Sequence, residues 1–584
     1  MIEPTPSQHP GQATRHADFG VIAEALDFAA QGPTGINFYS GKGALTEVLP
    51  YSVLRVQALD LARRMIAAGL EPGDRVGLVA ESDGDFVRAF FACQYAALVP
   101  APLPLPAAFG GKDSYISHLR RLIESADAVA VFVPTTLEKW LDDVVAGLDL
   151  KISGTLAPLY DIEPSTGELP SQDPEGLSYL QFSSGSTRFP LGIAVTQRAF
   201  MANASSISRD GLGIRDGDRA ISWLPFYHDM GLVGFLLTPV TCQMSLDIIP
   251  TREFARRPLL WLNLISRNRC TVSFSPSFGY DLCVRRAETA STEGIDLSSW
   301  RSAGIGGDMI RPNVLTRFLE RFAPIGFSAG AFVPSYGMAE ATLGLSFMRP
   351  GQGALYDTID VAVLETAQRA VPPSETTSRA RTFIKCGYML PGHDVEVRNE
   401  ADAVLPDRHV GRIMVRGPSL MTCYFGAPEE TARVLTDQGW LDTGDLGYLV
   451  DGQIVITGRA KDLIIVNGRN LWPQDLEWTA EAEVAALRSG DVAVFSVDGE
   501  TDEEVVALVQ CRTADPAARA ALAVEISDIF RGRHGLNSNI VLVPPHSLPQ
   551  TSSGKLSRSR ARTMYLADAF SPLSVALPAD AGAE

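Results

Sequence analysis

The segment "LQFSSGSTRFPLG", residues 180–192, contains five consecutive small residues that carry a hydroxyl group or no side chain. They are Ser183, Ser184, Gly185, Ser186 and Thr187. Glycine lets a backbone approach a ligand closely and hydroxyls donate hydrogen bonds, so the run is typical of a phosphate-binding loop. Arg188 and Leu191 stand where such a loop is expected to carry glycine and lysine. An ordinary surface turn is the alternative interpretation.

Two further segments contain residue types suited to a nucleotide. In "SYGMAEATLG", residues 335–344, the aromatic face of Tyr336 suits a purine and the carboxylate of Glu340 suits Mg²⁺. In "WLDTGDLGYL", Asp445 stands at a strand-turn and could accept hydrogen bonds from both ribose hydroxyls. The structural alternatives are a buried core tyrosine and a turn aspartate.

Three generic catalytic motifs are absent or weak. None of the Gly-Lys pairs is followed by Ser or Thr, so there is no Walker A loop. "GIGGDM" places Met309 where a dinucleotide fingerprint needs its third glycine. "GFSAG" fits a nucleophile elbow around Ser328, but Pro334 and Gly337 interrupt the helix that should follow. A hydrolase is therefore the less favoured interpretation.

The composition is that of an ordinary globular protein that does not bind nucleic acid. The chain has 584 residues, 46% hydrophobic and 20% charged, with a net charge of −18, whereas nucleic-acid binding needs a concentrated positive field. Seven scattered cysteines suggest neither disulfides nor a zinc site, and the N-terminus lacks a secretory pattern, so we expect a cytoplasmic protein. The uncharged run 89–109 is interrupted by four prolines, which excludes a membrane helix.

Helical and strand-like segments alternate along most of the chain, which predicts an α/β fold with parallel sheets. Residues 357–381 break the alternation with a short helix and a polar, proline-containing run, as an inserted surface element does. Short strands follow up to about residue 458, and a small α/β unit comes after them. Residues 571–584 are expected to be a disordered tail.

In their order along the chain, these motifs resemble those of the adenylate-forming superfamily, which contains acyl-CoA synthetases, luciferases and peptide synthetase adenylation domains. The resemblance extends from about Ala25 to about Leu566 and includes "LPFYHDMGL", "SPSFGY", "GIGGDM", "GRAKDLIIVNGRN" and "TSSGKLSR". Within the superfamily, Arg188, Leu191 and the insertion before "KCGYMLPGH" resemble the fatty acyl-AMP ligases.

The resemblance implies a domain organisation. Residues 1–458 form a large N-terminal domain of two α/β sheet subdomains and a β-rich subdomain, with 357–381 as the subfamily's insertion. Residues 459–461 form the hinge, centred on Lys461, and residues 462–584 form a small, mobile C-terminal domain.

It also implies the roles of individual residues. The implied catalytic residues are Lys555, Glu340, His228 and Thr187, and Glu340 is the implied ligand of Mg²⁺. The ATP-binding residues are Ser183, Ser184, Gly185, Ser186, Thr187, Arg188, Gly306, Gly307, Asp308, Ser335, Tyr336, Gly337, Met338, Asp445 and Arg459. The residues that contact the fatty acid are His228, Met230, Gly231, Ser275, Ser277 and Phe278.

The implied reaction joins a medium- or long-chain fatty acid to AMP, releases pyrophosphate, and then transfers the acyl group to the phosphopantetheine of an acyl carrier protein. Two alternatives stay open at this point. An acyl-CoA synthetase uses the same first step but transfers the acyl group to CoA. The second alternative is a non-catalytic relative that only binds adenylate. It is disfavoured by the presence of Glu340, Asp445, Arg459 and Lys555.

Overall fold

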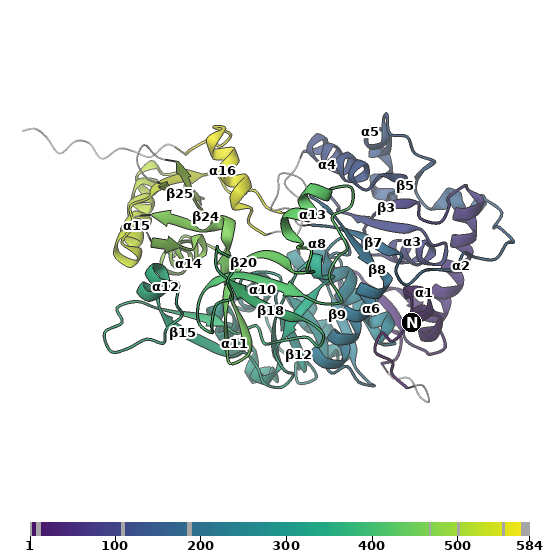
Figure 1. The fold of residues 1–584 in the computed structure, drawn as a ribbon, viewed down its shortest axis with the longest axis horizontal. Helices are drawn as coiled ribbons and strands as arrows, with labels where there is room; N and C mark the ends of the chain where they lie inside the picture. Colours follow the sequence, from purple (N-terminus) through teal and green to yellow (C-terminus); the bar gives the residue numbers. More distant parts are fainter. Residues whose placement is uncertain are drawn as a thin grey trace, which may run out of the picture.

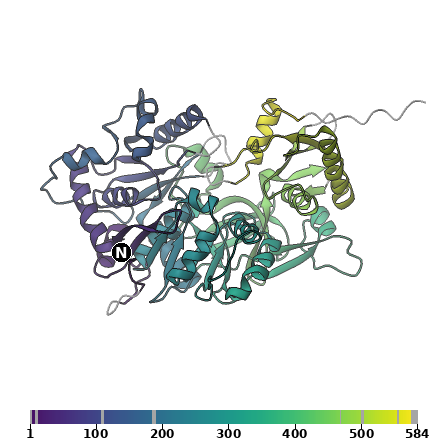
Figure 2. The same ribbon diagram turned by 180° about the vertical axis from the view of Figure 1, so that it is seen from behind.

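The computed structural model describes residues 3–7, 13–106, 111–183, 190–466, 469–498, 503–551 and 555–573. Figures 1 and 2 show several sheets wrapped by helices, with the N-terminal half at one end of the molecule and the C-terminal helices α14 (Pro473–Glu483), α15 (Pro516–His534) and α16 (Arg558–Leu566) at the other. The predicted α/β class is therefore confirmed.

The largest sheet has nine strands in the order β17-β14-β13-β12-β11-β9-β10-β1-β2. Its central strands are parallel, while β2, β14 and β17 pair antiparallel at the two sides. Strands buried on both faces have few charged residues, as the central ones show. The bounds are β1 (Gly35–Tyr39), β2 (Leu45–Pro50), β9 (Arg219–Ser222), β10 (Ser245–Ile248), β11 (Val272–Ser275), β12 (Ser302–Ile305), β13 (Phe332–Gly337), β14 (Gly344–Phe347) and β17 (Tyr388–Met389).

A second, four-stranded sheet is parallel, in the order β4 (Val99–Leu103), β3 (Arg75–Val79), β5 (Ala128–Phe132), β6 (Ile152–Gly154). Most of the uncharged run at residues 89–109 belongs to this sheet and to the helix that precedes its strand β4. Helix α3 (Gly84–Tyr95) ends before the prolines, and Pro100 and Pro102 lie in β4, an edge strand that tolerates missing N–H donors. Within the described residues no helix is long and apolar enough to cross a membrane.

The β-rich region is an antiparallel sheet of β18 (Asp394–Arg398), β19 (Gly411–Arg416), β20 (Leu441–Val450) and β21 (Gln453–Arg459), as predicted. A separate hairpin, β7 (Leu177–Phe182) with β8 (Gly192–Thr196), flanks the predicted phosphate-binding loop. The small C-terminal domain contains β24 (Val492–Asp498), β25 (Glu503–Gln510) and β26 (Asn539–Val543). Of the tail predicted at 571–584, only residues 571–573 are described, and Leu573 N donates to Leu542 O.

The insertion forms a hairpin of β15 (Tyr356–Asp360) and β16 (Ala380–Ile384), with α12 (Val361–Ala367) between them. It is more than a surface element. Leu364 and Ile359 are fully buried, and α12, labelled in Figure 1, packs against β23 (Arg469–Leu471) of the small domain. The sequence suggested a polar outer segment because its buried apolar residues are few and widely spaced.

The remaining helices and strands complete the layers around these sheets. Their bounds are α1 (Ile22–Ala29), α2 (Tyr51–Ala67), α4 (Lys112–Ser125), α5 (Leu141–Val145), α6 (Gln197–Ser206), α7 (Thr238–Thr241), α8 (Thr251–Arg256), α9 (Leu259–Asn268), α10 (Ser277–Ala287), α11 (Pro312–Phe322), α13 (Pro428–Val434) and β22 (Ile464–Val466). There are also two π-helical segments. The first, η3 (Ile207–Gly211), continues α6, and the second, η4 (Met230–Leu237), leads directly into α7. Segments of this type are frequent at functional sites.

Ser328 does not form a nucleophile elbow. Its hydroxyl accepts a hydrogen bond from Gly330 N and caps a short 3₁₀ turn, and the residue is exposed. The hydrolase alternative therefore has no structural support.

Candidate active site

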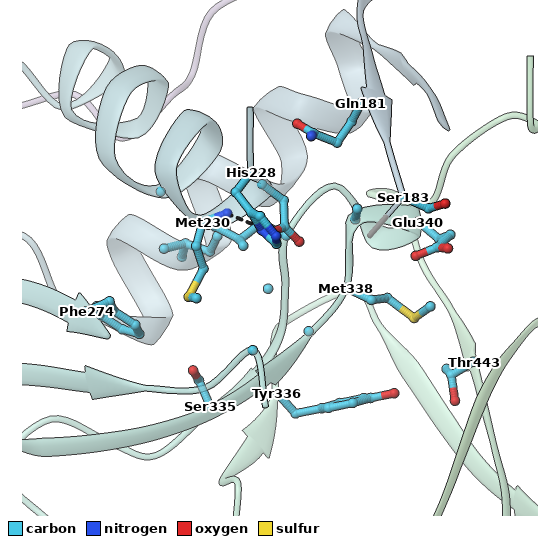
Figure 3. Close-up of a pocket in the computed structure, with 18 of the residues that line it drawn as sticks. Gln181, Ser183, His228, Met230, Phe274, Ser335, Tyr336, Met338, Glu340 and Thr443 are labelled. Atoms are coloured by element: carbon cyan, nitrogen blue, oxygen red, sulfur yellow. Dashed lines mark hydrogen bonds and ion pairs between the residues drawn. The ribbon is translucent and has the colours of Figure 1, made fainter. Parts of the chain in front are cut away.

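A cavity of about 330 Å³ lies where β7, η4, β13, β20, β21 and Lys555 meet (Figure 3). Its lining changes in character from one part to another. One part is polar and includes Ser183, Glu340, Thr443, Arg459 and Lys555. The other part, the apolar arm, is lined by Ile207, Leu212, Ile214, Phe235, Met244, Val272, Phe274, Leu343 and Phe347. The cavity can thus hold a molecule with a charged end and an apolar end.

Gly306 and Gly307 leave room at the junction of the two parts. A Cβ at Gly306 would lie 2.7 Å from Ser335 Oγ. A Cβ at Gly307 would lie 2.8 Å from Met230 Cε and 3.9 Å from Lys555 Nζ, and its φ of +75° also favours glycine. Both positions therefore require glycine, and the side chains of Met230 and Lys555 converge on Gly307.

Tyr336, Asp445 and Arg459 form a connected polar group beside the cavity. Tyr336 Oη donates to Asp445 Oδ2 at 2.8 Å, and Arg459 Nε lies 3.1 Å from Asp445 Oδ1. The Asp445 charge raises the pKa of Arg459, and burial raises the pKa of Tyr336. These contacts fix the ring of Tyr336, whose position at the cavity wall is seen in Figure 3.

Glu340 places a carboxylate in the polar part of the cavity, next to Ser183 in Figure 3. Tyr424 Oη donates to Glu340 Oε1 at 2.9 Å, and burial raises the pKa of Glu340 above its usual range. A partly buried carboxylate that is incompletely hydrogen-bonded gains from a nearby cation.

His228 and the half-buried Asp229 form a pair at the start of η4. His228 Nδ1 lies 3.0 Å from Asp229 Oδ1, which also accepts from Met230 N at 2.8 Å. Burial alone would raise the pKa of Asp229, but His228 and the charge of Lys555 together hold it below its usual value. Lys555 Nζ itself donates to Gly307 O. The ammonium group therefore lies where the polar part meets the apolar arm.

The structure brings many of the predicted residues into one lining. These are Ser183, His228, Met230, Gly307, Ser335, Tyr336, Gly337, Met338, Glu340, Arg459, Lys461 and Lys555. Gly306, Asp308 and Asp445 lie next to the lining without forming part of it, and Asp308 Oδ1 accepts from Met309 N. The predicted residues Ser184, Gly185, Ser186, Thr187 and Arg188 lie outside the described part of the chain.

Four predicted acyl-contact residues are not among the described residues that line this cavity. The ring of Phe278 packs edge-on against Trp223, and Ser277 Oγ donates to Met309 O. Gly231 packs against the backbone of Pro225, and Ser275 Oγ donates to Pro276 O. Their contact with substrate stays a prediction.

Sequence reasoning did not find Asp442, Thr443 and Gly444, which line the cavity from β20. They lie in the same quoted motif as Asp445, but only that residue was selected. It also did not find most of the apolar arm, nor Gly234 and Thr238, which line the cavity from η4 and α7.

The donor set fits a Mg²⁺ ion that is held mainly by phosphate oxygens. No group of three or more His, Cys, Asp or Glu side chains that could hold a metal exists among the described residues. Mg²⁺ needs only one or two carboxylates when phosphates and water supply the other ligands, and Glu340 offers one. The described residues do not provide enough side-chain ligands to hold a metal ion without phosphate or water.

Comparison with known proteins agrees with this site. Residues 30–425 match the family described as "AMP-binding enzyme". The chain is 55% identical over 570 residues to a Caulobacter vibrioides protein named "Putative acyl-CoA synthetase", covering 98% of this chain and 99% of that one. It is 32% identical to the medium-chain-fatty-acid–[acyl-carrier-protein] ligase JamA of Moorena producens, over 88% of this chain and 90% of that one.

Among solved structures, the chain matches one from a study of fatty acyl-adenylate ligases from E. coli and L. pneumophila. The TM-score is 0.91 at 43% identity, and the match covers 95% of this chain and 99% of that one. The family match extends over more than half of the sequence and includes most of the cavity's lining. The chain therefore belongs to the AMP-binding enzymes, the adenylate-forming superfamily, with the fold of a fatty acyl-adenylate ligase.

Proposed function

We propose that this protein uses ATP to convert a medium- or long-chain fatty acid into acyl-AMP, with release of pyrophosphate. One observation carries the proposal: a single cavity joins a polar part, with Glu340, Arg459 and Lys555, to an apolar arm. The similarity to a fatty acyl-adenylate ligase structure supports the same reaction. The polar part suits ATP and the arm suits the hydrocarbon chain.

In this reaction an oxygen of the fatty acid carboxylate attacks the α-phosphorus of ATP. A new C–O–P linkage forms, the bond from the α-phosphorus to the bridging oxygen breaks, and pyrophosphate leaves with that electron pair. Positioning and electrostatic stabilisation dominate such transfers. Lys555, at the junction beside Gly307, is suited to stabilise the charge that accumulates on the phosphoryl oxygens.

The other residues position the reactants. Tyr336 offers its ring to adenine, and the Asp445–Arg459 pair holds the ribose. Glu340 would hold Mg²⁺, which neutralises phosphate charge when bound. His228 lies next to the carboxylate's expected position and is fixed by Asp229.

The test is mass spectrometry after incubation of the purified chain with ATP, Mg²⁺ and a panel of fatty acids of different lengths, without a thiol. We expect acyl-AMP and one equivalent of pyrophosphate for a subset of chain lengths. Absence of fatty-acid-dependent pyrophosphate release across the whole panel would contradict the proposal.

We propose an acyl carrier protein as the acceptor, because the insertion holds the small C-terminal domain in place. Glu365 of α12 is only 5% exposed and pairs with Arg379 at 2.7 Å and with Arg469 of the small domain at 2.8 Å. Arg381 of β16 pairs with Asp475 at 2.6 Å. Separation would leave the buried Glu365 without Arg469 and would part Arg381 from Asp475, so both pairs oppose it.

Apolar packing acts at the same interface. Trp472 of the small domain belongs to one buried cluster with Ile359, Leu364 and Phe383 of the insertion. Gly458 lies against the indole of Trp472, since a Cβ on Gly458 would be 2.4 Å from Trp472 Cδ1. We propose that the small domain turns about Lys461, in the short segment η8 (Ala460–Asp462), and that these contacts disfavour the turn.

The second candidate is an acyl-CoA synthetase, which the name of the relative at 55% identity favours. A free CoA molecule must capture a rarely populated arrangement, whereas a carrier protein can stabilise that arrangement through its own surface contacts. Supplying CoA and a phosphopantetheinylated carrier protein in parallel separates the two. Robust acyl-CoA formation at ordinary CoA concentrations would overturn the acceptor assignment and leave the adenylation step intact.

A substitution at Tyr336 tests how the nucleotide is held. Tyr336→Phe keeps the ring but removes the hydrogen bond to Asp445, so we expect the KM for ATP to rise by less than about tenfold. Tyr336→Ala also removes the ring and should raise that KM further. Initial rates of pyrophosphate release at varied ATP measure both, and equal effects would exclude a role for the ring.

The pH dependence of domain separation tests the interface. Burial and the charge of Arg379, which outweigh the opposing charge of Glu365, lower the pKa of His534 from 6.5 to about 4 while the domains are together. A depressed histidine pKa favours the neutral form, so the closed arrangement loses stability as pH falls from 6.5 towards 4. If separation restores the ordinary pKa, lowering the pH to 5.5 shifts the equilibrium towards the open form by up to about tenfold.

Energy transfer between labels on the two domains measures this shift. His534→Gln should abolish most of the change between pH 7.5 and 5.5. An unchanged pH response in that variant would show that His534 does not control the interface.

A further inference from the structure

Thr238 belongs to the residues that line the cavity, at the end of η4. Its side chain is 2% exposed, and its Oγ1 has no hydrogen-bond partner among the described residues. A buried hydroxyl without a partner costs about 1–3 kcal/mol. Gln181 Oε1 is the other unpartnered buried atom of the described lining, but Gln181 lies near Ser183 in the polar part.

The local helix geometry explains why this hydroxyl is unpartnered. A helical threonine commonly donates to the carbonyl four residues earlier. Thr238 follows the π-helical segment η4, and its N–H donates to Val233 O, five residues earlier. In contrast, Thr241 on the same helix donates to Thr238 O at 2.8 Å. Of these two threonines, the one without a partner is therefore the one that belongs to the cavity's lining.

Thr238 lies at the far end of a helical stretch that begins at the reacting end of the cavity. Met230 meets Lys555 and Gly307 at the junction, and Thr238 follows Met230 by eight residues along one helical stretch. At the α-helical rise this is at most ~12 Å. Met244, whose N–H donates to Pro239 O, lines the cavity beside this end of the helix.

We propose that the preferred substrate is a fatty acid that carries a hydroxyl group along its chain, away from the carboxylate, and that Thr238 binds this hydroxyl. A hydroxyl can donate and accept, so the substrate's oxygen satisfies Thr238 Oγ1 and is itself satisfied in an otherwise apolar wall. The inference rests on the proposed fatty acid adenylation and specifies its substrate.

The experiment compares kcat/KM for pyrophosphate release with fatty acids of equal length. One is unsubstituted, one carries a 3-hydroxyl, and a series carries one hydroxyl at successive positions from mid-chain to the terminal carbon. We expect a maximum within the series, about tenfold above the unsubstituted acid. The 3-hydroxy acid should show no gain, because its oxygen lies near the junction.

Three variants identify the residue responsible. Thr238→Val keeps the side-chain volume but removes the hydroxyl, so it should abolish the preference and retain activity on the unsubstituted acid. Thr238→Ser should keep the preference. Thr457→Val is the matched control, since Thr457 Oγ1 is also buried and unpartnered but lies on β21 outside the lining. It should leave the preference unchanged.

A wild-type protein that adenylates unsubstituted acids without any hydroxyl preference would overturn this inference alone. A preference that survives in Thr238→Val would do the same. No pyrophosphate release with any acid would instead refute the proposed adenylation. If Thr238→Val fails to fold, the wild type and Thr238→Ser still test the inference. A preference for one hydroxyl position in both proteins supports it, and no preference in the wild type overturns it.

Discussion

Replacing Lys555 with alanine is expected to lower the rate constant of adenylate formation by a factor of about 10²–10³. Lys555 Nζ donates to Gly307 O at the junction of the polar part and the apolar arm, where the α-phosphate and the carboxylate must meet. Its charge is most useful when negative charge builds up in the transition state. ATP affinity should therefore change much less than the rate.

Single-turnover formation of acyl-AMP gives the rate, and calorimetry gives ATP affinity. Lys385→Ala is the matched control, because Lys385 pairs with Asp451 and does not line the cavity. It should retain full activity. Near-normal adenylation by Lys555→Ala would mean that Lys555 is not the catalytic cation.

Replacing Glu365 with alanine is expected to increase acyl-CoA formation by roughly 5–150-fold, the range of a coupling of 1–3 kcal/mol. The change removes a carboxylate that pairs with both Arg379 and Arg469, and so weakens the contact between the insertion and the small domain. The arrangement that accepts a thiol is then populated more often, and CoA can use it without help from a carrier.

The measurement is the initial rate of acyl-CoA formation, with acyl-AMP formation as the internal reference. Thr366→Ala on the same helix removes an exposed hydroxyl that donates to Ala362 O within the helix, and should leave both rates unchanged. Shortening the insertion should act in the same direction. If Glu365→Ala forms acyl-AMP normally but no additional acyl-CoA, the contact does not restrict the acceptor.

The fold and the polar half of the site were predictable because their determinants are local. The alternation of apolar segments indicated parallel sheets, and the β-rich region lies where the short strands were expected. Gly307, Tyr336 and Glu340 belong to short motifs whose residue types suggest nucleotide chemistry by themselves. Their convergence on one cavity followed from the order of the motifs.

The apolar arm could not be read from the sequence, because its residues look like ordinary core. Leu212, Phe274 and Phe347 come from distant segments, and nothing in their identity separates cavity wall from packed interior. The π-helical geometry that leaves Thr238 unpartnered has no sequence signature here. Phe278, an expected acyl contact, packs on Trp223, and a contact of this kind depends on tertiary packing that the sequence does not show.

The insertion was located correctly as an interruption, but its partners were not predictable. Glu365 pairs with Arg469 across 104 residues, and no local pattern links the two. Burial of the carboxylate depends on both the hairpin and the small domain being in place. Charge pairs of this kind become visible only when the fold is known.

The packing of Trp472 gives this protein a built-in optical probe. Two of its seven tryptophans lie at the domain interface. Trp472 contacts Gly458, and the centre of its ring is 5.6 Å from the Arg381 guanidinium. The Arg311 guanidinium lies 4.9 Å from the centre of the Trp478 ring. Both indoles belong to the small domain, and both cations belong to the large one. Separation would replace cation and apolar surroundings with water, which alters the emission of an indole. Stopped-flow fluorescence of the unlabelled enzyme can therefore follow the turn in real time, during a single catalytic cycle.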